Sequence, residues 1–172
     1  MAITSFTKFQ DGNRLINGTK LNRIFQGNEY VQNLAISGTL AVTGAMTQTG
    51  VLTVTANIVA TGYVDFSTAT GLTAAGTTRT DALALTKAIN NVTTAAASTG
   101  VVLPSAATVG VGGSVIVFNN GASAIKVYAP GSDTIDGTAG STGVTLTNAL
   151  RCQYFVTAAA TWISAKLGAT ST

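Results

Sequence analysis

Asp133 and Asp136 are the two acidic side chains that lie closest together in this sequence. They occur in the stretch GSDTIDGT, where two carboxylates at this spacing could hold Ca²⁺ or act as an acid and base pair. Ser, Asp and Gly in this order also form turns in which the carboxylates cap backbone N–H groups. We therefore expect a turn here, and an ion site or a hydrolytic pair is the alternative.

The other chemically capable side chains are few. The chain contains no histidine, which removes the usual general base of nucleophilic triads and a common zinc ligand. Its single cysteine, Cys152, shares one face of a predicted strand with Tyr154 and Val156, and we expect it to be a small buried hydrophobe. Tyr128, Tyr154 and Trp162 could form a sugar-binding face, although aromatic residues on strands usually belong to the core. The sequence thus predicts no enzyme activity, no metal and no cofactor.

A run of six hexapeptides over residues 33–68 dominates the chain: NLAISG, TLAVTG, AMTQTG, VLTVTA, NIVATG and YVDFST. The fifth place is always Ser or Thr, and Gly closes four of the six blocks. The second place is always apolar, as Leu34, Leu40, Met46, Leu52, Ile58 and Val64. Short units of β-forming residues that end in turn residues predict a strand-and-turn repeat stacked along an axis.

Such a thin repeat cannot be stable alone. Burying one apolar side chain contributes about 1.5–3 kcal/mol, whereas ordering each backbone residue costs about 1–2 kcal/mol. We therefore expect residues 33–70 to form a β shaft in which several chains wind around a common axis. A single-chain β-helix and an ordinary β-meander are the alternatives.

Composition supports association between copies. The chain of 172 residues is 46% hydrophobic but only 9% charged, against about 25% charged residues in ordinary globular domains. Much of its surface is therefore expected to carry Ser and Thr or to be covered by other copies. The net charge of +3 is small and the basic residues are scattered, which predicts no nucleic-acid partner. We also expect no membrane span and no signal peptide, hence a soluble protein made in the cytoplasm.

Residues 1–32 differ in character from the repeat, because they contain four of the nine basic residues together with several aromatic residues. The pattern NGTKLNRIF over residues 17–25 predicts a short helix, which is too short to be stable in isolation. We expect a docking arm that folds against a larger partner. A terminus that merely covers the base of the shaft is the alternative.

Residues 71–172 predict a compact β domain. We expect a hinge-like junction over 71–81, a strand in place of a helix within 82–98, and short strands at 101–104 and 143–147. Two hairpins are predicted, one over 114–130 around Asn119-Asn120-Gly121 and one over 151–167. The predicted fold class is all-β, with an antiparallel β-sandwich or jelly roll as the distal domain.

Several phrases of the chain resemble structural proteins of tailed bacteriophages, such as head fibres, capsid decoration proteins and tail-fibre-like modules. These phrases are DGNRLINGTKLNRIF, LAVTGAMTQTGVLTVTANIVATG, VIVFNNGASAIKVYAPGSDTIDG and YFVTAAATWIS. The resemblance implies a homotrimer with an arm bound to the virion, an intertwined shaft and a distal β domain. It implies no catalytic residue.

Among these proteins, the short chain favours a decoration or head-fibre protein on the capsid surface over a receptor-binding tail fibre. The expected partner is the major capsid protein at a site where three subunits meet. The residues expected to dock are Phe9, Arg14, Leu21, Arg23 and Phe25. A tail-fibre or adhesin module that binds a host surface glycan is the alternative.

Overall fold

The computed structural model describes residues 42–43, 45–50 and 52–169, and the chain divides into two compact units after Asn57. The predicted arm, its helix over 17–25 and the first part of the shaft lie outside the described residues. Every strand that the structure describes belongs to the second unit, residues 58–172.

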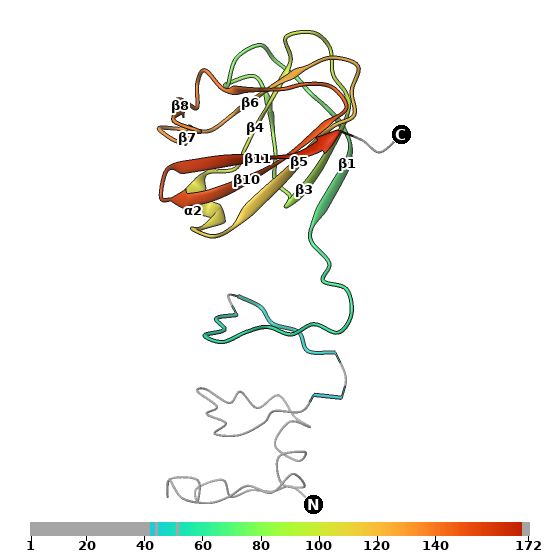
Figure 1. Ribbon diagram of the computed structural model, residues 1–172, viewed down its shortest axis with the longest axis vertical. Helices are drawn as coiled ribbons and strands as arrows, with labels where there is room; N and C mark the ends of the chain where they lie inside the picture. The colour runs from blue at the N-terminus through green and yellow to red at the C-terminus, as the bar shows by residue number, and fades with distance from the viewer. Residues whose placement is uncertain (1–41, 44, 51, 170–172) are drawn as a thin grey trace, which may run out of the picture. The chain divides into compact units, whose positions relative to one another are not determined.

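The regular elements of the second unit are strands apart from one four-residue helix, as predicted for an all-β protein (Figure 1). In chain order the elements are β1 (Thr68–Thr73), β2 (Leu83–Ala84), β3 (Ile89–Thr94), β4 (Gly100–Val102), α2 (Ala106–Val109), β5 (Ser114–Asn119), β6 (Ile125–Tyr128), β7 (Thr134–Ile135), β8 (Thr138–Ala139), β9 (Val144–Leu146), β10 (Leu150–Ala158) and β11 (Thr161–Ala169). Strands β3, β5 and β10 alternate between buried and half-buried residues, because successive side chains of a strand point to opposite faces.

These strands form two sheets, one of seven strands in the order β1-β3-β5-β10-β11-β7-β8 and one of four in the order β2-β4-β6-β9. The first six strands alternate between the two sheets, so each pair of consecutive strands makes one coil of a flattened spiral. Successive coils stack in parallel, with Ile89 paired to both Thr68 and Ile116. This arrangement is a short solenoid, in which each coil contacts its neighbours along the axis.

Antiparallel strands close the solenoid after its third coil. In the larger sheet β10 pairs with β5 and then turns back to form a hairpin with β11, and the three strands lie side by side in Figure 1. In the smaller sheet β9 pairs antiparallel with β6. At the other end, β1 and β2 are the terminal strands of their sheets.

The core lies between the two sheets. Its largest fully buried side chains come from both of them and include Val92, Val101, Val117, Val127 and Trp162. The second and third coils therefore contribute buried valines to the core, and the closing hairpin adds Trp162.

Three predictions for this domain are confirmed. The region 82–98 forms strands β2 and β3, the segments at 101–104 and 143–147 contribute β4 and β9, and residues 151–167 form the hairpin of β10 and β11. These segments carry their own local signals, namely alternating apolar residues and turn residues at their ends.

We predicted that the strands of the β domain pair antiparallel. This is wrong, because five of the nine strand pairings are parallel. The predicted hairpin around Asn119-Asn120-Gly121 is also wrong, since β5 belongs to the larger sheet and β6 to the smaller one. The turn carries the chain from one sheet to the other. A jelly roll consists of antiparallel strands, so this strand order does not establish one.

The predicted junction over 71–81 is part of the β domain, whose first strand already begins at Thr68. The carboxylate of Asp81 accepts a hydrogen bond from the N–H of Thr78 at 2.7 Å. The Arg79 guanidinium donates to the carbonyl of Gly131 at 2.6 Å, and the Tyr128 hydroxyl donates to the carbonyl of Thr77 at 3.0 Å. These bonds fasten the segment to the sheets, so the expectation of a hinge here is wrong.

Candidate functional site

Among the residues that the structure describes, most of the exposed large apolar side chains lie in the hexapeptide repeat. Four of its second-place residues are described, and Met46, Leu52, Ile58 and Val64 are 59%, 57%, 74% and 59% exposed. Leu34 and Leu40 lie outside the described residues. In a single chain the described second-place side chains therefore have almost no partners.

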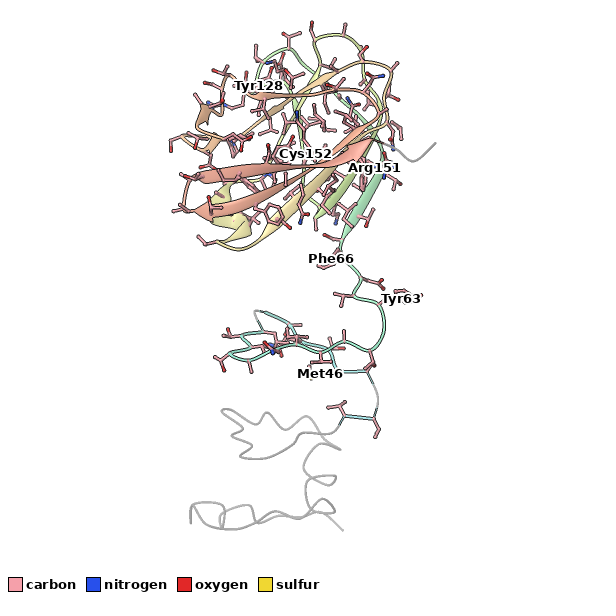
Figure 2. All side chains as sticks on the ribbon, in the orientation of Figure 1. Met46, Tyr63, Phe66, Tyr128, Arg151 and Cys152 are labelled. Carbon is pink, nitrogen blue, oxygen red and sulfur yellow. The ribbon has the colours of Figure 1, made fainter. Side chains whose placement is uncertain are left out.

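Apolar residues at other places of the repeat are exposed as well. Val59, Tyr63 and Phe66 are 84%, 101% and 63% exposed, and Figure 2 labels Tyr63 and Phe66 on the segment that leads into β1. No charged residue occurs between Val42 and Val64. A continuous exposed apolar stretch of this kind is typical of an interaction site.

The described residues of 42–67 contain neither helix nor strand in the single chain. The single-chain β-helix, the β-meander and the multi-chain shaft all call for strands in the repeat, so this observation does not choose among them. The multi-chain shaft requires further copies, and it stays a prediction.

The two aspartates form caps, as the turn interpretation predicts. Asp133 is only 8% exposed, and its carboxylate accepts a hydrogen bond from the N–H of Ala106, the first residue of α2, at 2.8 Å. Asp136 accepts from the N–H of Ser164 at 2.8 Å and from the Ser164 hydroxyl at 2.6 Å. Each carboxylate thus binds a different element, and together they tie both ends of β7 to the rest of the domain.

The three candidate aromatic residues do not form an exposed face. Tyr128, Tyr154 and Trp162 are 4%, 1% and 0% exposed. The core interpretation is therefore confirmed, and the sugar-binding alternative for these residues is wrong.

Cys152 is buried, as predicted, at 3% exposure. Burial raises the pKa of its thiol, and burial likewise raises the pKa of the neighbouring Tyr154 hydroxyl. Since the thiolate is the reactive form of cysteine, the environment disfavours a nucleophile here.

The five residues expected to dock on a capsid, Phe9, Arg14, Leu21, Arg23 and Phe25, lie outside the described residues. Among the residues that the structure does describe, no three His, Cys, Asp or Glu side chains gather as metal ligands would. Within the same part of the chain, no helix has the length and apolar character needed to cross a membrane.

A second apolar surface, which was not predicted from the sequence, is the outer face of the seven-stranded sheet. Its six large apolar residues are half-buried or exposed: Ile89, Ile116, Phe118, Phe155, Ile163 and Leu167. The available signal was the run VIVF at 115–118, because a strand without polar alternation is typical of one covered on both faces. We define these six residues as the outer apolar face.

No known protein family, characterised protein or solved structure matches this chain.

Proposed function

We propose that this protein is a non-enzymatic structural component of a virion, a homotrimeric decoration or head-fibre protein bound to the major capsid protein. One observation carries the proposal. A tightly packed β domain follows a repeat that has no charged residue from Val42 to Val64 and whose described second-place residues, Met46, Leu52, Ile58 and Val64, are all more than half exposed. Exposure on this scale favours a segment that other copies of the chain cover.

The state of the reactive side chains supports a binding role. The two carboxylates that could have done chemistry are engaged as caps, and the single thiol is buried. The arm, residues 1–32, would dock across neighbouring capsid subunits and tie them together, while the distal β domain projects. A protein that binds the assembled shell and not free subunits stabilises the shell by mass action.

The first test is the mass of the full-length protein in solution by light scattering. The proposal expects three copies per particle. A monomeric mass at working concentration would contradict the proposed trimer and, with it, the proposed function.

The second test removes residues 1–32 and measures whether the truncated protein still binds purified capsids. Loss of binding with an unchanged oligomeric mass is expected if the arm is the anchor. Undiminished capsid binding would show that another surface docks. If the full-length protein bound host cells and blocked infection instead, the adhesin alternative would replace decoration.

A further inference from the structure

The outer apolar face is unusual for a domain of two packed sheets. In such domains the inner residues of each strand form the core and the outer residues face water, so the outer ones are normally polar. Here Ile163 and Leu167 are 43% and 47% exposed, and the other four residues of the face are half-buried. The larger sheet therefore resembles a sheet that needs a cover on both sides.

The strand register places these apolar residues on one face, although between β5 and β10 each of them pairs with a polar or charged residue. Ile89 of β3 pairs with Ile116 of β5, and Phe155 of β10 pairs with Ile163 of β11. Phe118 of β5 pairs with Arg151 of β10. Side chains of directly paired residues lie on the same face, so the apolar residues extend across four neighbouring strands.

The polar residues among them are already satisfied by one another. Gln153 donates to the Ser114 hydroxyl at 3.0 Å, and Asn120 donates to the Asn91 carbonyl oxygen at 2.8 Å. The only charged residue of the face, Arg151, lies over the Phe118 ring at 5.4 Å, and its buried Nε has no partner. Around the six apolar residues there is no anionic group, and the one cation is stacked on a ring. Such a surface is better suited to contact with another apolar surface than with a charged partner.

Chain connectivity indicates which apolar surface covers it. β1 is the edge strand of this same sheet, and it continues directly from the exposed repeat. Copies joined through the repeat would carry their outer apolar faces at a high local concentration, which favours contact between them without additional affinity. The low charge of the whole chain, 9%, agrees with surfaces that face other copies.

We propose that the outer apolar face packs against a second copy of this chain, so that the β domains of the proposed trimer contact one another through their seven-stranded sheets. This inference rests on the proposed function, because it takes the repeat to hold the copies together. It adds a second contact surface, distant in sequence from the repeat.

The test uses thiol labelling of the full-length protein with a maleimide reagent. The variant Ile163→Cys reports on the outer apolar face, and Thr145→Cys reports on an exposed residue of the smaller sheet. The native Cys152 is buried and serves as the unlabelled background. Each variant is compared with the same variant carrying Leu52→Asp, which is designed to separate the copies.

We expect Cys labelling at position 163 to be at least ten-fold slower in the trimer than in the separated chain, and labelling at position 145 to be equal in both. The fluorescence of buried Trp162, which neighbours Ile163, checks that each variant is folded. Leu167→Cys provides a second reporter on the same face if Ile163→Cys does not fold.

The outcomes separate this inference from the proposed function. A trimeric mass combined with fast labelling at both 163 and 167 would overturn the sheet contact and leave the trimer intact. A monomeric mass for the unsubstituted protein would overturn both. Protection at position 163 that arises only on capsids would show that the capsid, and not a second copy, covers the face.

Discussion

Asp133 and Asp136 show how two residues suited to chemistry can instead be structural. Asp133 bonds the first N–H of α2, and Asp136 bonds the N–H and hydroxyl of Ser164 on β11. These three hydrogen bonds to carboxylates, together with the buried Ile135, hold the segment in the domain.

Asp133→Ala is expected to destabilise the β domain by about 1–3 kcal/mol, because it leaves the buried N–H of Ala106 without a partner. Asp133→Asn keeps a carbonyl oxygen as acceptor and should cost less. Urea denaturation followed by Trp162 fluorescence measures both. The exposed Asp65→Ala is the control and is expected to change stability by less than about 0.5 kcal/mol. Equal stability of Asp133→Ala and the unsubstituted protein would contradict the capping role.

The hydrogen bonds to the Asp81 carboxylate predict that the free energy of unfolding depends on pH. The Thr78 hydroxyl, followed by the backbone N–H groups of Thr78 and Thr77, lowers the pKa of this carboxyl below its ordinary 3.8. At acidic pH the unfolded state therefore binds the proton more readily than the folded state, so the contribution of Asp81 is present above 3.8 and is lost as pH falls through the folded-state pKa.

We expect the urea midpoint to fall between about pH 5 and about pH 3, and to fall less in Asp81→Asn, which cannot titrate. Thr78→Ala, which removes the hydroxyl donor and leaves both N–H donors, should give an intermediate slope. An identical acid loss in Asp81→Asn and the unsubstituted protein would rule out this contribution.

At the scale of elements, the turn between β5 and β6 decides the topology. The buried Asn119 side chain accepts from the N–H of Gly121 at 3.2 Å and donates to the carbonyls of Ser123 at 2.9 Å and Leu146 at 3.0 Å. Gly121 itself packs so closely that an added Cβ would lie 2.5 Å from the Cβ of Ala95. Both residues hold the chain in a path that crosses between the sheets.

Asn119→Ala is expected to cost at least about 2 kcal/mol, since it removes three hydrogen bonds from buried or half-buried groups. Asn120→Ala, at the exposed neighbouring position, removes one exposed bond and should cost less than about 1 kcal/mol. Thermal or urea unfolding compares the two variants. Similar losses would mean that the turn is held by its backbone and not by the Asn119 side chain.

Gly121→Ala is expected to destabilise the domain by about 1–3 kcal/mol, because the new methyl group would overlap Ala95 and force the turn to shift. Ala124→Ser, an exposed substitution in the same turn, is the matched control and should change stability by less than about 0.5 kcal/mol. If both variants had the same free energy of unfolding as the unsubstituted protein, the close packing at Gly121 would not contribute to stability.

At the scale of the whole molecule, the repeat and the β domain make separable contributions. The core of the β domain comes from its own two sheets, and none of its residues belongs to 42–66. A change in the repeat should therefore alter association without unfolding the domain.

Leu52→Asp places a charge at a second-place position and is expected to reduce the proposed trimer to separate chains, because a buried unpaired carboxylate is strongly disfavoured. Thr55→Asp introduces the same charge at a fifth-place position and should leave the oligomeric mass unchanged. Light scattering reads the mass, and Trp162 fluorescence should stay the same in both. If both variants dissociated, the second and fifth places of the repeat would not differ in their contribution to association.

The sequence by itself determined the local features of this protein. Alternation of apolar residues predicted the strands and turn residues predicted their ends. The absence of histidine predicted a buried Cys152, and the usual core position of aromatic residues on strands predicted buried Tyr154 and Trp162. The hairpin of β10 and β11 was predictable because its two strands are adjacent in sequence. Such features depend on neighbouring residues, which a single sequence displays directly.

Only the tertiary structure decided which strands pair and which faces remain uncovered. An Asn-Gly turn looks the same in sequence whether the chain returns within one sheet or crosses to another, and the outcome here depends on Asn119 bonding Leu146, a residue distant in the chain. Likewise, the stacking of Thr68, Ile89 and Ile116 joins three segments with intervening strands. These contacts are non-local, and their energies depend on the assembled core, so no pattern within one segment could specify them.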